Sequence, residues 1–321
     1  MKAIVYEEYG SAEVLRYTDV DKPAIGDDKV LVRVRAASIN YGDRATMHGS
    51  PSIMRLAFGL RRPKKAVLGR DIAGTVEAVG AKVTRFRAGD QVFGEMSQRG
   101  FAEYVAAPET HLAPKPEGVT FEQAATLPVA GTTALQALRL GEVAPGRTVL
   151  VNGASGGVGT FAVQLAKTLG AVVSGVCSPR NADLVRSIGA DHVIDYTRED
   201  FTRGAGRFDV IVDLAGNHRL SEFRRVLAPK GVYISSSGTG GAVLGPLPRL
   251  FAVAAISPFL SQRLRGLYTK RSIDDLTHLA GLIATGKITP VIERTYPLSE
   301  TADAIRFIEA EHARGKIVLT L

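Results

Sequence analysis

The run VLVNGASGGVG at Val149–Gly159 is the strongest indicator of the fold in this sequence. An apolar run typical of a strand leads into a glycine-rich turn, and a helical pattern follows over 161–169 and ends at Gly170. A strand, a glycine turn and a helix in this order can bind a dinucleotide pyrophosphate, because glycines let the backbone approach the phosphates and the first helical turn offers free N–H groups. The alternative is a tight strand-to-helix turn that binds no ligand.

The turn departs from the G-x-G-x-x-G pattern of such sites, because Ala154 stands at the first glycine. A second apolar run at 171–176 follows the helix, so a complete βαβ unit is present. The turn residues are therefore predicted to bind the cofactor: Ala154, Ser155, Gly156, Gly157, Val158 and Gly159.

The end of the second strand predicts which cofactor binds. NAD-binding units place a carboxylate there to accept from the ribose 2′-hydroxyl, but this strand ends in Cys177-Ser178-Pro179-Arg180-Asn181. Ser178 can donate to a 2′-phosphate and Arg180 can pair with it, so NADPH is favoured over NADH. An ordinary surface role is the alternative for Arg180, and Asp183 is expected in the first turn of the next helix.

The fold class is predicted to be α/β, with a doubly wound parallel-sheet (Rossmann) domain and a second, β-rich domain. Residues 121–270 alternate helices with apolar strands, which indicates a parallel sheet covered on both faces. Its strands are expected near 148–152, 171–176, 192–194, 209–213, 231–236 and 267–269. The β-rich domain is expected to comprise 1–120 and 271–321, with strands at 29–37, 72–80, 89–94, 101–105 and 315–321 and a helix near 273–285.

Composition narrows the class of protein. The 321 residues suffice for two domains, and the single cysteine, Cys177, excludes an intramolecular disulfide framework and a zinc site built from cysteines. A reducing compartment fits this composition, and residues 1–8 lack the apolar run of a signal peptide, so a cytoplasmic protein is predicted.

The net charge of +8 could indicate an anionic partner, and an anionic cofactor accounts for part of it. The basic cluster at 61–65 is the only support for nucleic-acid binding, and no nucleic-acid motif accompanies it. The apolar stretch at 250–260 is about half the length needed to span a bilayer and contains Pro258. It predicts a buried helix or an apolar lid rather than a membrane anchor.

Taken in order, several motifs resemble the medium-chain dehydrogenase/reductase superfamily, closest to its zinc-free quinone oxidoreductase branch. They are Val30–Val34 followed by Asn40, then 69–74, 89–93, 154–159, 189–196 and 315–318. The resemblance covers essentially the whole chain. It implies a GroES-like catalytic domain, a Rossmann domain and a homodimer built through the edge strand of the Rossmann sheet.

Zinc-dependent members of this superfamily carry a cysteine where Asn40 stands and histidine followed by glutamate where Arg70 and Asp71 stand. They also carry four clustered cysteines that this chain lacks. The histidines are scattered without ligand spacing: His48, His111, His192, His218, His278 and His312. No metal site is therefore predicted. Without a Lewis acid, hydride transfer favours electron-poor acceptors such as quinones and α,β-unsaturated carbonyls.

The resemblance also implies site residues. Asn40 is expected beside the nicotinamide and the substrate, where its amide could donate to a carbonyl or hold the cofactor carboxamide. Tyr41 either donates a proton or packs, and Asp43 either supports the loop or transfers a proton directly. Thr126 and Thr132 flank a segment expected under the nicotinamide, with helix capping and backbone bonding as the alternatives for both.

Three further cofactor contacts are predicted, each with an ordinary structural role as its alternative. Tyr196 is expected near the 2′-phosphate, Ser235 ends the fifth strand together with Ser236 and Ser237, and Lys316 could reach the cofactor. The sequence thus predicts an NADPH-dependent, zinc-independent oxidoreductase that acts on quinones or α,β-unsaturated carbonyls, without nucleic-acid or membrane partners. Two alternatives are an NADP-dependent alcohol dehydrogenase or ketone reductase, and a non-catalytic NADPH-binding sensor or nucleic-acid-binding protein.

Overall fold

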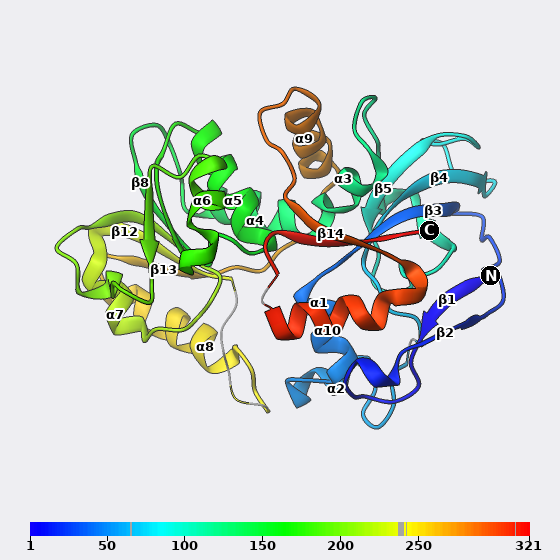
Figure 1. The fold of residues 1–321 in the computed structure, drawn as a ribbon, viewed down its shortest axis with the longest axis horizontal. Coiled ribbons are helices and arrows are strands. Elements are labelled where there is room, and N and C mark those ends of the chain that lie inside the picture. The colour runs from blue at the N-terminus through cyan, green and yellow to red at the C-terminus, as the bar shows by residue number, and fades with distance from the viewer. Residues whose placement is uncertain (65, 237–240, 242, 312) are drawn as a thin grey trace. The chain divides into compact units, whose positions relative to one another are not determined.

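The computed structural model describes residues 1–64, 66–236, 241, 243–311 and 313–321. Contacts divide the chain into a first unit of Met1–Thr132, Arg271–Gly286 and Pro290–Leu321, and a second unit of Thr133–Lys270 and Lys287–Thr289. The predicted α/β class is confirmed, because the first unit is β-rich and the second contains a parallel sheet (Figure 1). Lys65, Ser237 and His312, which the sequence analysis considered, lie outside the described residues.

A seven-stranded sheet forms the framework of the first unit, with the order β14-β15-β3-β4-β5-β7 and with β6 paired to β3. Its central strand, β3, pairs antiparallel with β4, β6 and β15. The chain end therefore returns to this sheet, as predicted. The strands are β3 (Lys29–Ile39), β4 (Asp71–Val79), β5 (Gln91–Glu95), β6 (Tyr104–Pro108), β7 (Leu112–Pro114), β14 (Ile292–Pro297) and β15 (Lys316–Thr320), and β1 (Lys2–Val5) pairs separately with β2 (Arg16–Asp19).

Short helices connect these strands. They are α1 (Tyr41–His48), α2 (Arg55–Phe58), α3 (Phe121–Ala125), a π-helical turn (Leu127–Gly131), α9 (Ile273–Ala284) and α10 (Thr301–Glu311). Helices α1 and α10 are distant in sequence but are joined by His48 Nε2, which lies 2.7 Å from Glu309 Oε1 (Figure 1). Helix α1, which follows β3 directly, is thereby held against the C-terminal part of the chain.

The second unit is a parallel six-stranded sheet with the order β10-β9-β8-β11-β12-β13, the strand order of a dinucleotide-binding fold (Figure 1). The strands are β8 (Thr148–Asn152), β9 (Val172–Cys177), β10 (His192–Asp195), β11 (Phe208–Asp213), β12 (Leu227–Ser235) and β13 (Arg263–Gly266). The helices are α4 (Thr132–Leu140), α5 (Gly157–Thr168), α6 (Ala182–Ser187), α7 (Leu220–Val226) and α8 (Leu247–Ile256). In parallel sheets of this kind, ligands bind at the carboxyl ends of the strands.

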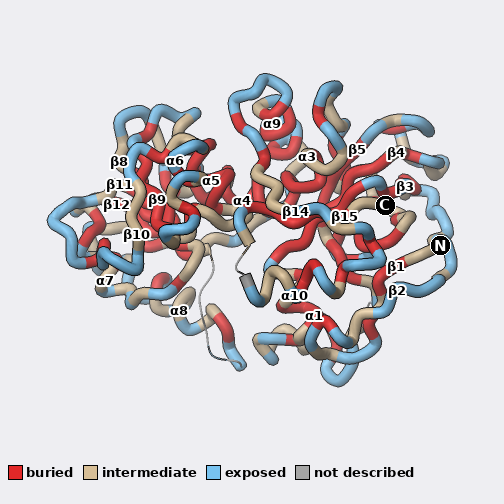
Figure 2. The backbone as a smooth tube through the Cα atoms, in the orientation of Figure 1, coloured by how far each residue is buried: buried red, intermediate tan, exposed pale blue. Residues whose placement is uncertain are grey.

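The apolar stretches account for both cores. In each unit the central strands are buried and the connecting turns are exposed (Figure 2). One cluster packs Val30, Val32 and Val34 of β3 against β4, β5 and β6, and another packs β8, β11 and β12 around Phe223 and Tyr233. No helix among the described residues is long and apolar enough to cross a membrane.

One local prediction was wrong, and one of the two alternatives for the stretch 250–260 is excluded, which leaves the apolar lid as a prediction. The sixth strand of the parallel sheet lies at Arg263–Gly266 rather than 267–269, because Gly266 ends the pairing with β12 at Ser235. The stretch 250–260 falls in α8 and the turn after it, but α8 is not a buried helix. Phe251 and Phe259 are 71% and 86% exposed, and Val253 is the buried residue of the helix. Hydropathy alone does not reveal which apolar helix finds a partner surface.

Candidate active site

The glycine turn of the second unit connects β8 to α5, and its contacts explain two of its glycines. Gly153 adopts φ +91°, and its carbonyl oxygen would lie 2.1 Å from a Cβ added to Gly159. A side chain at Gly159 would therefore push α5 away from the turn. At Gly156 an added Cβ would meet that carbonyl oxygen at an ordinary 3.5 Å. The N–H groups of Gly157 and Val158 lie in the first turn of α5, where no intrahelical acceptor is available.

Ala154 stands at the first glycine of the motif, and Gly175 on β9 makes room for it. A Cβ added to Gly175 would lie 2.9 Å from the Ala154 Cβ and 2.6 Å from Val185 Cγ1. Ala154 is fully buried, and its N–H donates to the carbonyl of Val176 at 3.0 Å. A glycine on the neighbouring strand thus compensates for the departure from the motif.

Two alanine substitutions should separate folding from phosphate binding at this turn. Gly156→Ala is expected to fold normally but to bind NADPH about tenfold more weakly, because its methyl group would lie where a phosphate approaches the backbone. Gly159→Ala is expected to lower the melting temperature as well, because of its clash with Gly153. Gly206→Ala, with no atom within 4 Å of its added Cβ, serves as the control. Calorimetric titration and thermal melting measure both effects, and equal affinity in Gly156→Ala and wild type would contradict the prediction.

The carboxyl ends of β9 and β10 bring together the residues predicted to surround the 2′-phosphate. Ser178 follows β9 and is half-buried, and Arg180 lies exposed in the short helical turn after it. Tyr196 follows β10 and is 54% exposed, and its N–H donates to the carbonyl of Cys177 at 3.4 Å. The three predicted side chains therefore lie at adjacent strand ends of one sheet.

Sequence reasoning missed Asn181, which joins this region to the glycine turn. Asn181 Nδ2 donates to Ser155 Oγ at 3.0 Å, while its own Oδ1 is buried without a partner among the described residues. Asp183 lies in the first turn of α6, as predicted, and its carboxylate pairs with Arg186 at 3.0 Å. No carboxylate stands at Ser178–Asn181 itself.

In the first unit, a buried polar cluster forms where β15, β3 and β4 lie side by side. Lys316 Nζ donates to Asn40 Oδ1 at 2.5 Å and to the Ile39 carbonyl at 3.1 Å, and lies 3.7 Å from Asp71 Oδ2. Asn40 Nδ2 donates to the same Asp71 oxygen at 2.9 Å and to the Ser38 carbonyl at 3.4 Å. The hydroxyl of Ser38 also donates to Asp71 Oδ2, at 3.0 Å.

These contacts give Asn40 and Lys316 structural roles, and their predicted contacts with the cofactor stay predictions. Both N–H groups of the Asn40 amide are engaged within the cluster, so the amide can donate to a substrate only by exchanging a partner. Lys316 is 3% exposed and belongs to the interior of the unit. Burial lowers the pKa of Lys316 and raises the pKa of Asp71, while their mutual attraction opposes both shifts. The resemblance had named Asn40 and Asp71 together as zinc-ligand positions of other members, but no pattern in the sequence joined Ser38 to this cluster.

Asp43 lies beneath the cluster on α1 and is fully buried. Its Oδ2 accepts from the Asn40 N–H at 2.8 Å, while its Oδ1 has no partner among the described residues. Burial raises the pKa of Asp43 to about 7, and the nearby Asp71 carboxylate adds to the shift. Its contacts are those of a residue that fixes the start of α1.

The raised pKa of Asp43 predicts a pH dependence of stability. The folded protein keeps this proton up to about pH 7, whereas the unfolded chain loses it near the ordinary value of 3.8. The free energy of unfolding should therefore fall as pH rises through this window, by about 1.4 kcal/mol per pH unit at most. Asp43→Asn, which keeps an acceptor for the Asn40 N–H, should lose this part of the slope. Urea unfolding at pH 5 and pH 8 measures the difference, and equal slopes in both proteins would count against it.

The predicted threonines adjoin the cluster through the π-helical turn at 127–131. The N–H of Val129 in this turn donates to Asp71 Oδ1 at 3.1 Å. Thr126 Oγ1 donates to the carbonyl of Gln123 at 2.6 Å, which is the backbone bonding proposed as one of its alternatives. Thr132 is also buried, and its hydroxyl has no partner among the described residues. Of the two hydroxyls, Thr132 is therefore the one available to a ligand.

An ion-pair chain, also missed from sequence, extends the cluster toward the surface of the first unit. Arg70 donates to Glu95, and Arg271 lies 3.4 Å from the same carboxylate. Burial lowers the pKa of Arg70, but the attraction of Glu95 outweighs it, so this pKa is raised. Tyr41, in contrast, is 72% exposed, and the Arg44 guanidinium lies 6.0 Å from its ring centre. Its hydroxyl is therefore accessible to a substrate or to water.

A second buried network lies at the carboxyl ends of β8, β11 and β12 in the other unit. Asp213 Oδ2 accepts from Tyr233 at 2.7 Å and from Arg249 of α8 at 2.8 Å, while its Oδ1 accepts from Asn152 at 2.8 Å. Ser235, a predicted cofactor contact, is buried and lies opposite Asp213 in the register of β11 and β12. The network fixes the loop that follows β11 at the edge where the glycine turn lies.

The positions where the resemblance places zinc ligands carry other chemistry. They hold Asn40, Arg70 and Asp71, and the Lys316 ammonium is bonded to the first and lies beside the third. A cation thus already neutralises these oxygens. Among the described residues, no group of three or more histidine, cysteine, aspartate or glutamate side chains is arranged to hold a metal ion.

Comparison with known proteins places the chain in a family. Residues 26–117 match the family model described as the alcohol dehydrogenase GroES-like domain, and residues 188–319 match the model described as zinc-binding dehydrogenase. The chain is 33% identical to the NADPH-dependent alkenal/one oxidoreductase of Arabidopsis thaliana, over 99% of this chain and 79% of the relative. It is also 33% identical to a chloroplast envelope quinone oxidoreductase homolog of the same plant, over 99% and 98%.

Solved structures agree with these relatives. The quinone oxidoreductase of Coxiella burnetii superposes with a TM-score of 0.89 at 32% identity, covering 100% of this chain and 99% of that one. The β-rich unit and the parallel-sheet unit are thus the GroES-like and Rossmann-like parts of a known architecture. The chain belongs to the medium-chain dehydrogenase/reductase superfamily, in its quinone oxidoreductase-like branch.

Proposed function

We propose that this protein is an NADPH-dependent, zinc-independent oxidoreductase that transfers hydride to quinones or α,β-unsaturated carbonyls. The single observation that carries the proposal is the Lys316 ammonium bonded to Asn40 beside Asp71, a cation built into the positions where zinc-dependent relatives carry ligands. The relatives are named as an alkenal/one oxidoreductase and as quinone oxidoreductases, and these names agree with the proposed substrate class.

The cofactor half of the proposal rests on the glycine turn and the end of β9. The close packing of Gly153 and Gly159 leaves the backbone of the turn free to approach a pyrophosphate, and α5 directs its first N–H groups there. Ser178 and Arg180 supply a donor and a cation for a 2′-phosphate, which favours NADPH. When bound, the cofactor supplies the hydride from its nicotinamide ring.

The donor set does not fit a catalytic zinc ion. Arg70 cannot ligate a metal, the Asn40 amide oxygen accepts from an ammonium, and the single cysteine lies on β9 in the other unit. An acceptor that already spreads incoming charge therefore suits this site better than an unactivated ketone. That argument disfavours an alcohol dehydrogenase or ketone reductase, and the relatives give no support for a purely non-catalytic protein.

A proton must reach the reduced acceptor after hydride transfer. The exposed hydroxyl of Tyr41 is the side chain we assign to this step, with solvent as the other source. Asn40 and Asp43 are assigned to hold the start of α1, and so the position of Tyr41, rather than to move the proton themselves. Tyr41→Phe should then lower kcat more for an enone, which must gain a carbon-bound proton, than for a quinone.

NADPH oxidation at 340 nm after extensive chelation tests the proposal. Parallel reactions would contain 1,4-benzoquinone, 9,10-phenanthrenequinone or an alkenal, and NADH would replace NADPH as the control. Turnover that resists the chelator and prefers NADPH is the expected result. Activity that is lost to the chelator and restored by zinc would overturn the metal-free mechanism, and tight NADPH binding without turnover would favour the non-catalytic alternative.

We also propose a cytoplasmic homodimer that pairs through β13, the edge strand of the parallel sheet. An unpaired edge strand offers backbone donors and acceptors to a second copy. Light scattering coupled to gel filtration distinguishes the dimer from a monomer.

A further inference from the structure

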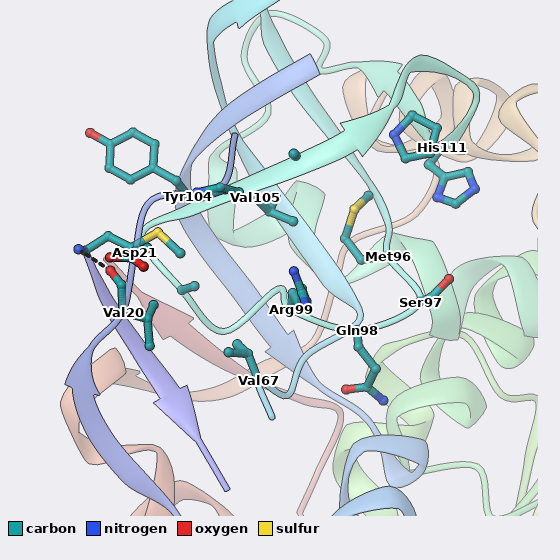
Figure 3. Close-up of a pocket in the computed structure, with 15 residues that line it drawn as sticks. Val20, Asp21, Val67, Met96, Ser97, Gln98, Arg99, Tyr104, Val105 and His111 are labelled. Carbon is teal, nitrogen blue, oxygen red and sulfur yellow. Dashed lines mark hydrogen bonds between the residues drawn. The ribbon is translucent and has the colours of Figure 1, made fainter. Parts of the chain in front are cut away.

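A cavity of about 490 Å³ lies in the first unit and is lined by residues that the proposed reaction does not use. Strand β6, the segment Met96–Arg99 and the chain that follows β2 form its walls (Figure 3). Sites for small organic molecules usually measure about 300–1,000 Å³. None of the described residues assigned above to the cofactor or to catalysis lines this cavity.

The walls of this cavity are mostly apolar. Val20, Val67, Met96, Val105 and Pro108 surround it, from four separate segments of the chain. Figure 3 shows β6 along one side of the cavity and Val67 on the other. An apolar chain or ring system would lose contact with water there, which is the main source of affinity in such sites.

Arg99 gives the cavity a positive side chain on a strained backbone, in addition to the Met1 ammonium, which donates to the Val20 carbonyl at 2.8 Å. Its φ is +80°, in the left-handed region that arginine rarely adopts, and its N–H is held by the Val67 carbonyl at 3.1 Å. Such strain is found preferentially at functional sites. Among the described residues the Arg99 guanidinium has no hydrogen-bond or ion-pair partner, so its donors are available to a ligand.

Asp21 restricts the charge of that ligand. Figure 3 shows Asp21 and Val20 at one end of the cavity, with Arg99 between this end and His111. A carboxylate beside Arg99 is attracted by the guanidinium. At the far end Asp21 offsets the Met1 ammonium, so that end does not attract a second carboxylate, which would be buried between apolar walls. The charge pattern thus fits a monoanion with an apolar body and disfavours a dianion.

We propose that this cavity binds a monocarboxylate with an apolar chain, such as a medium-chain fatty acid. The planar guanidinium of Arg99 pairs with the carboxylate, and the walls at Val67, Met96 and Val105 bury the chain. Met96 also donates its N–H to the Arg70 carbonyl at 2.6 Å. The wall of the cavity is therefore connected directly to the ion-pair chain next to the buried cluster.

Calorimetric titration of the full chain with decanoate tests the site, with 1-decanol and decanedioate as matched ligands. Wild type should bind decanoate at least about tenfold more tightly than decanedioate. Arg99→Gly removes the guanidinium and also relieves the strain, because glycine adopts positive φ freely. It should weaken decanoate binding about tenfold or more while 1-decanol binds unchanged.

Two further variants serve as controls for this experiment. Among the described residues, Glu142 is the other non-glycine residue with positive φ, and it does not line the cavity. Glu142→Gly therefore serves as the control, and it should leave decanoate binding unchanged. Val67→Trp should fill the cavity and abolish binding of both decanoate and 1-decanol, with folding checked by thermal melting.

The reaction supplies an independent readout. NADPH-dependent turnover of Arg99→Gly without added fatty acid should equal that of wild type, so failure of this site and failure of the proposed activity are distinguishable. The proposal is overturned if wild type binds no decanoate, if Arg99→Gly binds it as tightly as wild type, or if decanedioate and decanoate bind equally.

Discussion

Replacement of Lys316 by methionine is expected to lower the free energy of unfolding by about 3–5 kcal/mol, because it leaves the buried Asp71 carboxylate without its cation. Asn40 also loses the donor to its Oδ1, so the amide no longer has one fixed orientation. If the cluster holds the start of α1 next to the substrate that accepts the hydride, kcat/KM should also fall, by about 100-fold. Urea unfolding and initial rates with a quinone measure the two effects.

A surface ion pair provides the matched control for that result. Lys167 lies 2.8 Å from Asp191, closer than Lys316 lies to Asp71. The side chains of Lys167 and Asp191 are, however, both partly exposed. Lys167→Met should therefore cost only about 0–1 kcal/mol. The double variant of Lys316→Met with Asp71→Asn should be less destabilised than the sum of the two single variants, because the second change removes the stranded charge. Additive losses, or equal losses at both lysines, would show that Lys316 and Asp71 are not coupled.

Replacement of Ser178 by aspartate is the second large effect we expect. A carboxylate at the end of β9 would repel a 2′-phosphate and accept from a free 2′-hydroxyl. The ratio of kcat/KM for NADPH to that for NADH should fall by about 100-fold, which corresponds to about 2.7 kcal/mol. Steady-state kinetics with both cofactors and one quinone gives this ratio directly.

The control for this prediction adds the same charge on the next helix, away from the strand end. Ser187 is exposed in the last turn of α6, so Ser187→Asp should leave the cofactor ratio unchanged. If Ser178→Asp also leaves the ratio unchanged, the 2′-phosphate does not lie at the end of β9. Arg180→Ala should then have no effect on the ratio either.

The parallel-sheet unit could be predicted well because its signals are local. The run 148–159 places a strand, a turn and a helix within a dozen residues, and the turn is shaped by its own backbone contacts, such as Gly153 against Gly159. The error at the sixth strand arose where the pattern is weak, because Arg263–Gly266 alternates charged and apolar residues over four positions only. Asp213 could have been noticed as an acid ending a buried apolar strand.

The candidate site in the first unit could be predicted only in part. The resemblance pointed individually to Asn40, Asp43 and Lys316. The sequence did not reveal which residues they contact. Ser38 and Asp71 lie 33 residues apart in the chain, and Asn40 and Lys316 lie 276 residues apart. Such pairs meet only because β15 and β4 both pair with β3.

The two-part α/β architecture, the glycine turn and the lack of a carboxylate at the end of β9 could all be read from the sequence. Each of these features depends on residues that are close together along the chain. Three features became visible only in the folded structure. Asn40 is bound within a buried cluster, burial raises the pKa of Asp43 to about 7, and α8 is exposed. Burial and desolvation depend on which distant segments pack together, and strand register fixes this packing across the whole chain.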